Sequence, residues 1–210
     1  MPFDFKKEYR EFYLPGSKPA VVKIPPMNFI AVDGRGDPNE ENGEYKAAIE
    51  ALYSAAYAIK MSKLGDHRIE GYFDYVVPPL EGFWEQEGKS GFDYSDKSSL
   101  IWTSVIRLPD FVKPGDLEWA KNEAERKKKA DCSRLYFYAY DEGECVQVMH
   151  VGSYDSEPES IALMDGYAAS AGYSADLSSS RRHHEIYLSD PRRTAAEKMK
   201  TVIRHPVIKL

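Results

Sequence analysis

Short apolar runs broken by glycine and proline alternate with longer helical patterns along the chain. The runs are rich in β-branched and aromatic residues, which is typical of strands, and in the first half they lie at 20–24 (AVVKI), 28–34 (NFIAVDG), 71–77 (GYFDYVV) and 100–108 (LIWTSVIRL). Residues 44–64 instead repeat apolar positions every three or four residues and stop at Gly65, which predicts an amphipathic helix. Residues 1–18 carry neither pattern, so an irregular lead-in is expected.

The first half closes with a polar loop around 88–99 and a second helix. Pro114-Gly115-Asp116 opens this helix, which runs to about Lys129, and Asp116 is a good N-cap residue. The second half then restarts the order of elements. Ser156-Glu157-Pro158-Glu159 has the pattern of a capping box ahead of a helix to about residue 171. Strands are predicted at 134–140, 145–152, 183–188 and 201–207.

The two halves match when they are laid side by side. FIAVDGRGDPNEE in the first half corresponds to VMHVGSYDSEPES in the second. Both halves have the order strand, turn, strand, glycine with an acidic loop, helix, strand, strand. We therefore predict an α+β fold: one domain, residues 1–210, made of two pseudo-symmetric halves at about 19–130 and 131–210. Each half is too small to bury its sheet alone, so the halves should form one mainly antiparallel sheet with helices on one face. A ligand groove is expected along the junction of the halves, because concavities form there.

Composition narrows the possible partners. Hydrophobic residues at 42% and charged residues at 30% are typical of a globular protein, and a net charge of −6 argues against a nucleic-acid partner. The basic run 126–129 follows glutamates on the predicted helix and is interpreted as its solvated end. No stretch has the length of a membrane span or the core of a signal peptide, so no membrane partner is expected. Cys132 and Cys145 form no CxxC pair and are expected to be free thiols in a reducing, cytoplasmic compartment.

Aromatic side chains are the unusual part of the composition. Fifteen tyrosines supply rings with an apolar body and one polar atom, which suits a site for flat apolar ligands and also suits a half-buried sheet. Phe83 and Trp84 follow Pro78-Pro79 and are candidates for the lip of a pocket, or for a loop that caps the core. Trp102, in the middle of a predicted strand, is a candidate ligand contact or a core residue.

Glu185 is the central candidate. Strand alternation places His183, Glu185 and Tyr187 on one face and His184, Ile186 and Leu188 on the other. At most two of the three residues in His183-His184-Glu185 could then share a metal, so no metal site is predicted. The GxSxG, GK[ST], GxGxxG and HExxH patterns are also missing, and no cofactor is expected.

Glu185 and Tyr187 would face the groove if Ile186 and Leu188 face the helices. A carboxylate among aromatic rings can pair with a cationic ligand stacked on those rings, or act as a general base with a raised pKa. The alternative is an exposed strand on which Glu185 pairs with Arg181, Arg182 or a nearby lysine.

Several of these stretches together resemble the GyrI-like small-molecule-binding family, which includes drug-sensing domains of bacterial transcription regulators and stand-alone proteins. They lie between residues 28 and 207 and read FIAVDGRGDPN, PPLEGFW, IWTSVIRLPDFV, DEGECVQVMHVGSYDSEPES and HHEIYLSDPRRTAAEKMKTVIRHPV. No helix-turn-helix module precedes or follows them, so the chain looks closest to the stand-alone bacterial branch.

The resemblance implies a duplicated strand-helix-strand-strand (SHS2-type) unit with ligands in the central groove. Drug-binding members use a glutamate on a late strand, which corresponds to Glu185 in HEIYL. Part of the stand-alone branch hydrolyses strained cyclopropane rings in DNA-alkylating natural products, with an aromatic pocket and acidic and tyrosine side chains. The residues that could do this here are Trp84, Tyr136, Tyr138 and Glu185, with Phe83, Trp102, His183 and Tyr187 as ligand contacts.

The expected function is thus the binding of a small hydrophobic, cationic or electrophilic molecule, with hydrolysis of a cyclopropane-bearing toxin as its catalytic form. A drug-sequestering protein without turnover is the first alternative. A protein that interacts with DNA gyrase is the second, although the acidic residues are scattered among lysines and arginines instead of forming a stripe. We expect a monomer or a homodimer.

Overall fold

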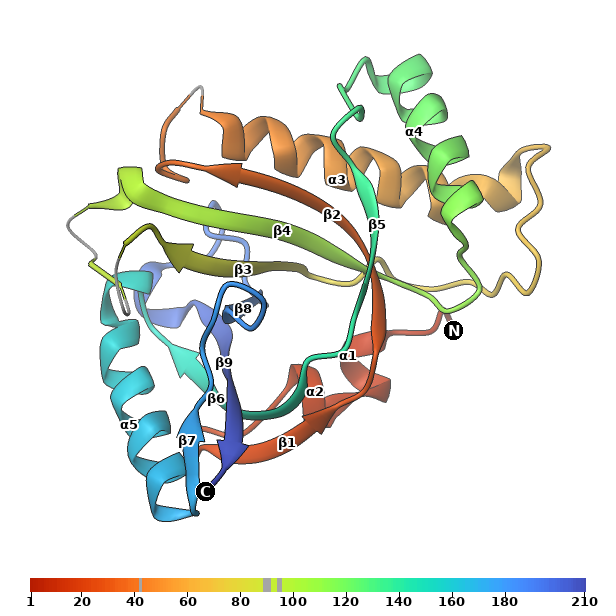
Figure 1. The fold of residues 1–210 in the computed structure, drawn as a ribbon. Helices are drawn as coiled ribbons and strands as arrows, with labels where there is room; N and C mark the ends of the chain where they lie inside the picture. Colours follow the sequence, from red (N-terminus) through yellow and green to blue (C-terminus); the bar gives the residue numbers. More distant parts are fainter. Residues whose placement is uncertain (42, 89–91, 94–95) are drawn as a thin grey trace. The chain divides into compact units, whose positions relative to one another are not determined.

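The computed structural model describes residues 1–41, 43–88, 92–93 and 96–210 (Figure 1). The chain forms two compact units, each assembled from separate segments. Unit 1 contains residues 1–5, 27–78 and 86–140, and unit 2 contains residues 6–26, 79–85 and 141–210. The predicted halves at about 19–130 and 131–210, and the groove at their junction, stay predictions.

Unit 1 has a three-stranded antiparallel sheet. Strand β2 (Met27–Arg35) lies between β4 (Leu100–Leu108) and β5 (Tyr136–Tyr140). Helix α3 (Glu44–Met61) runs along β2 and β4, and α4 (Pro114–Lys128) packs on α3 (Figure 1). Two 3-10 turns, η1 (Ser62–Leu64) and η2 (Lys97–Ser99), complete the unit. Most of the buried residues of α3 are small, which lets the sheet and α4 approach the helix closely: Ala48, Ala51, Leu52, Ala55, Ala56 and Ile59.

Unit 2 has a larger antiparallel sheet. Its strands follow the order β1 (Ala20–Ile24), β6 (Gly143–Val151), β9 (Lys200–Lys209), β8 (His183–Tyr187) and β3 (Leu80–Gln86, of which Gln86 belongs to unit 1). The short strand β7 (Tyr173–Ala175) pairs with the C-terminal end of β9. All the described strand pairs within the two units are antiparallel. The prediction of an α+β fold with a mainly antiparallel sheet is confirmed.

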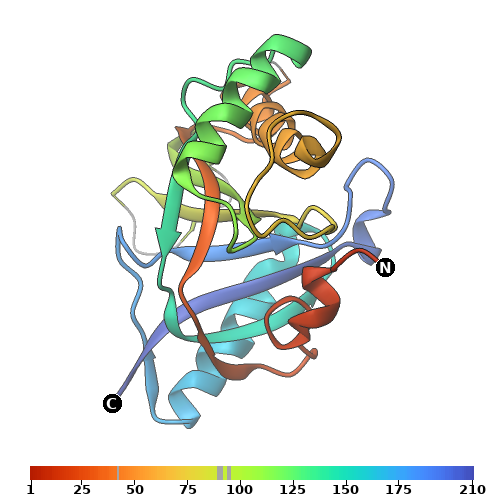
Figure 2. The same ribbon diagram turned by 90° about the vertical axis from the view of Figure 1, so that its right-hand side faces the viewer.

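The two faces of the unit 2 sheet carry different cores. Helix α5 (Glu157–Ser170) follows the turn η3 (Tyr154–Ser156) and packs on one face through Val146, Val148, Met164, Ala168, Ile203 and Val207. The N-terminal segment with α1 (Phe5–Glu8) and α2 (Arg10–Tyr13) contacts the other face, where Arg204 Nη2 donates to the carbonyl of Phe12. In Figure 2 the strands β6 and β9 pass between the red N-terminal helices and the cyan helix α5. The turn η4 (Ala196–Lys198) precedes β9.

The strand predicted at 71–77 is wrong. Only Tyr75 makes an isolated bridge there, to Phe3, and the rings of Phe73, Tyr75 and Phe111 pack against one another instead. Pro78-Pro79 delays the strand, since proline has no N–H to donate. The strand begins at Leu80 and includes the GFW stretch that was interpreted as a pocket lip or loop.

Two predicted helix caps are also wrong. Lys113 is the N-cap of α4, and Asp116, at N3, accepts the N–H of Lys113 at 2.9 Å. Ser156 precedes α5 but makes no capping bond, because its hydroxyl donates to the carbonyl of Ser153 at 2.7 Å.

The predicted irregular lead-in, residues 1–18, contains the short helices α1 and α2. Both cysteines are free, as predicted. The predicted loop around 88–99 includes residues 89–91 and 94–95, which lie outside the described part. Among the described residues no helix has both the length and the apolar character needed to span a membrane.

Candidate functional site

The pairing of β8 with β3 builds the surroundings of Glu185. Gly82 lies opposite Glu185 and Trp84 lies opposite His183, so the side chains of these pairs share one face of the unit 2 sheet. Strand β9 adds Ile203 opposite Glu185 on the other side. Because Ile203 packs on α5, Glu185 faces the same side as that helix.

The predicted alternation along β8 is confirmed, but the condition that Ile186 faces the helix is not met. Ile186 lies on the face opposite α5, next to the N-terminal segment, and Glu185 lies under the beginning of α5. The sequence shows which residues share a face but not which face the helix covers.

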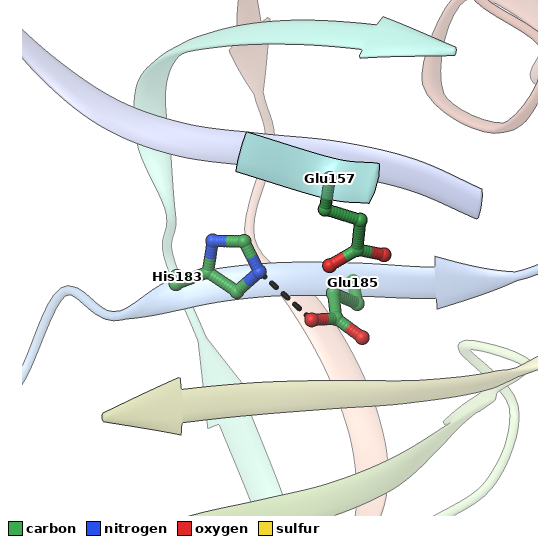
Figure 3. Close-up of side chains that lie close together, drawn as sticks. All are labelled: Glu157, His183 and Glu185. Carbon is green, nitrogen blue, oxygen red and sulfur yellow. Dashed lines mark hydrogen bonds and ion pairs between the residues drawn. The ribbon is translucent and has the colours of Figure 1, made fainter. Parts of the chain in front are cut away.

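A histidine pair holds the Glu185 carboxylate. His183 Nε2 lies 2.9 Å from Glu185 Oε1, a contact drawn in Figure 3. Nδ1, the other ring nitrogen of His183, lies 2.7 Å from His205 Nε2. The two histidines are buried, and the Glu185 side chain is 13% exposed. The alternative pairing with Arg181 does not form, since Arg181 pairs with Asp176 and donates to the carbonyls of Glu142 and Glu144.

A second carboxyl group, Glu157, lies beside Glu185. It is the first residue of α5 and is 1% exposed (Figure 3). Burial and the neighbouring charge of Glu185 raise the pKa of Glu157 to about 10. Burial alone would also raise the pKa of Glu185, but hydrogen bonds from His183, Tyr187 and Glu157 and the charge of His183 lower it. The raised pKa that one of the two possible roles of Glu185 requires is thus found at Glu157, and not at Glu185.

Aromatic side chains line the same face. Trp84 Nε1 donates to the hydroxyl of Tyr187 at 2.8 Å, across the position of Gly82. A Cβ atom at Gly82 would lie 2.5 Å from Trp84 Nε1, so only glycine leaves room for this bond. The Tyr154 ring meets the Tyr187 ring edge-on at 6.0 Å. Burial and the charge of Glu185 raise the pKa of Tyr154 to about 12, which keeps its hydroxyl a hydrogen-bond donor.

The opposite face of β8 carries a buried ionic network. His184 contacts Glu142 Oε1 and Glu81 Oε2, each at 3.0 Å, and Arg204 Nη1 donates to Glu142 Oε2 at 3.0 Å. Burial would raise the pKa of Glu142, but His184 and Arg204 lower it to about 2. Burial would lower the pKa of His184, but Glu142 and Glu81 raise it. Two acidic and two basic side chains thus pair inside unit 2. Their hydrogen bonds hold β8, the strand that carries Glu185, in place.

The other predicted site residues lie elsewhere. Phe83 points to the opposite face and packs on His184, with ring centroids 4.2 Å apart. Trp102 is fully buried in unit 1 under Gly34, where a Cβ atom would lie 2.1 Å from the indole. Tyr136 and Tyr138 are on β5 of unit 1, where the Tyr136 hydroxyl donates to Asp33 at 3.0 Å. Of the predicted residues, the structure brings together Trp84, His183, Glu185 and Tyr187, and their roles toward a ligand stay predictions.

Sequence reasoning missed Glu157, Tyr154 and His205. Glu157 was assigned to a capping box, and Tyr154 lies in the VGSYDSEPES stretch that aligns with the first half. His205 follows the alternation of β9, which places it opposite His183. Tyr154 and Glu157 lie at the start of a helix, and His205 lies on the strand beside β8. These positions indicate a site only when the pairing of the strands is known.

The described residues contain one group with the donor spacing of a metal site. One donor atom each from Glu157, His183 and Glu185 lies within 4.8 Å of the others. This closeness suits a divalent ion, and it equally suits two carboxyl groups that share a proton.

Comparisons with known proteins agree on the family. The model of the GyrI-like small molecule binding domain matches residues 17–208. Crystal structures of an uncharacterized conserved protein and of a hydrolase, both from Listeria innocua, are 50% and 48% identical to the chain, with TM-scores of 0.92 and 0.89. Each alignment covers 98% of this chain and 100% of the other. The EcmrR C-terminal domain is 14% identical with a TM-score of 0.54, over 92% of this chain and 98% of that domain, and shows the shared fold alone. No curated protein matches the chain.

Proposed function

The chain belongs to the GyrI-like family of small-molecule-binding domains, and we propose that it binds hydrophobic cations and electrophiles against the Glu185 carboxylate. The observation that carries the proposal is the environment of this carboxylate. Glu185 is largely buried, remains ionised beside His183, and lies on a face with Trp84, Tyr187 and Tyr154. A negative charge among aromatic rings attracts an apolar cation through both its charge and its surface.

Hydrolysis of a strained cyclopropane is the catalytic form of this proposal. The name hydrolase on a relative with 48% identity supports it, as does an ionised carboxylate that can take a proton from water. Water would attack the unsubstituted ring carbon while Glu185 accepts its proton. The ring bond would break toward a conjugated carbonyl, whose oxygen takes up a proton, so that one water is added in total. A tyrosine hydroxyl would donate a hydrogen bond to that oxygen, with Tyr136 and Tyr138 as sequence candidates and Tyr154 as the candidate beside Glu185.

Two ions of the same shape and opposite charge test the binding proposal. We expect the protein to bind tetraphenylphosphonium and to discriminate against tetraphenylborate, measured by quenching of tryptophan fluorescence. Glu185→Gln should weaken phosphonium binding roughly ten- to hundredfold, because the cation loses its partner in a poorly hydrated place. The same substitution should leave borate binding unchanged or strengthen it.

Glu159→Gln is the matched control, since Glu159 is exposed and lies two residues from Glu157 on α5. It removes the same charge from the same unit and should change neither affinity. Equal phosphonium affinity in the wild type and Glu185→Gln would show that the ligand does not depend on Glu185 and would overturn the proposal.

A further inference from the structure

Glu157 is a buried ionisable side chain that the proposed function does not use. Its Oε1 atom has no hydrogen-bond partner among the described residues, and the side chain is 1% exposed. The beginning of a helix favours an ionised carboxylate. However, the Glu185 carboxyl lies beside it: one oxygen of each group lies within 4.8 Å of the other, and Figure 3 shows the two side chains next to each other. Two ionised carboxylates this close repel strongly where water is excluded.

His183 offsets part of that repulsion, since its hydrogen bond and charge lower the pKa of Glu185. His183 is engaged by Glu185 on one ring nitrogen and by His205 on the other. Asp155 adds a further negative charge near Glu157. The titratable groups around the pair come from β8, from η3 and from β9 and are His183, Tyr187, Tyr154, Asp155 and His205. A hydrogen bond between two carboxyl groups requires one proton, because ionised carboxylates only accept.

We propose that Glu157 and Glu185 share one proton, with Glu157 as the carboxylic acid that donates a hydrogen bond to the Glu185 carboxylate. Glu157 is then a positioning residue that acts through Glu185. Together with His183 it fixes the orientation of the carboxylate and keeps it ionised. The pair carries one negative charge instead of two. The site therefore selects a monovalent organic cation or a neutral electrophile over a divalent metal ion, although the donor spacing would admit the metal.

Infrared spectroscopy of the ligand-free protein tests the shared proton directly. A protonated carboxylic acid has a carbonyl stretch that is separate from the carboxylate bands. We expect one such band at pH 7, which Glu157→Gln removes and the exposed control Glu159→Gln leaves in place. No acid band in the wild type at pH 7, or a band that persists in Glu157→Gln, would overturn the inference.

Substitutions at Glu157 give a second readout that a merely structural role would not move. Glutamine keeps an uncharged N–H donor, so Glu157→Gln should bind tetraphenylphosphonium within about threefold of the wild type. Glu157→Leu removes the donor and should weaken binding about tenfold at pH 6, with recovery as the pH rises and Glu185 ionises again. If Glu157 were ionised, Glu157→Gln would lose affinity for the cation. If Glu157 held a divalent ion, the wild type would bind zinc stoichiometrically. Either result would contradict the shared proton.

The inference rests on the proposed function only for the role of Glu185, and the two can fail separately. The infrared band needs no ligand. A band that depends on Glu157, combined with phosphonium binding that ignores Glu185, would leave the carboxyl pair intact and remove the proposed function. Phosphonium binding that depends on Glu185, without an acid band, would support the proposed function and remove the shared proton.

Discussion

Arg204→Met is expected to lower the free energy of unfolding by about 3–5 kcal/mol at pH 7, because it leaves the buried Glu142 carboxylate without its arginine. Arg204 is 2% exposed and also donates to Gln147 Oε1 at 3.0 Å and to the carbonyl of Phe12 at 2.8 Å. Urea denaturation followed by circular dichroism measures the loss. Arg192→Met is the control, since Arg192 is 86% exposed and its pairing with Asp190 is screened by water.

The pH dependence of this loss has a definite sign. Glu142 has a pKa of about 2 in the folded protein, against an ordinary value of 4.5 for a glutamate. Its stabilising charge is therefore fully present above about pH 4.5 and is lost as the pH falls toward 2. The difference between the wild type and Arg204→Met should narrow at pH 3. A difference below about 1 kcal/mol at pH 7, or one that widens in acid, would contradict a balanced ionic network.

Glu185→Gln is expected to slow the opening of a cyclopropane-bearing alkylator by roughly 10²–10⁴, the usual contribution of a general base. The wild type should accelerate the addition of one water over buffer alone, measured as product by mass spectrometry. Glu159→Gln should retain the wild-type rate.

Other outcomes of these experiments distinguish the hydrolase from the sequestering protein and from the gyrase-interacting protein. An undiminished rate in Glu185→Gln would remove Glu185 as the base. No acceleration by the wild type, together with recovery of unchanged ligand, would leave a sequestering protein. A pull-down that recovered a topoisomerase would favour the gyrase-interacting alternative.

The sequence predicted elements well where local pattern decides. Residues 100–108 form β4 over the expected range, because a run of β-branched and aromatic residues with no proline allows little else. The sequence did not predict strand β3, because Glu81, Gly82 and Glu85 interrupt its apolar pattern. Glu81 is 2% exposed in that strand only because His184 and Tyr13 satisfy its carboxyl oxygens. The partners of a buried charge come from distant parts of the chain, so the local sequence does not show that the charge can be buried.

The candidate site was predicted in part for the same reason. Alternation along β8 gave His183, Glu185 and Tyr187 a common face, which the structure confirms by the contacts of Glu185 with the other two. Glu157 could not be predicted, because its place beside Glu185 depends on where α5 crosses the sheet. Phe83 and Trp84 looked equivalent in a loop, but a strand separates them to opposite faces.

The location of a bound cation is the most direct test of the account. A crystal structure with tetraphenylphosphonium should place the phosphonium beside Glu185, with phenyl rings on Trp84, Tyr187 or Tyr154. Unit 1 offers a contrasting place, a pocket of about 200 Å³ lined in part by Glu44, Glu50 and Arg134. A cation found there, or anywhere away from the Glu185 carboxylate, would contradict the proposed function.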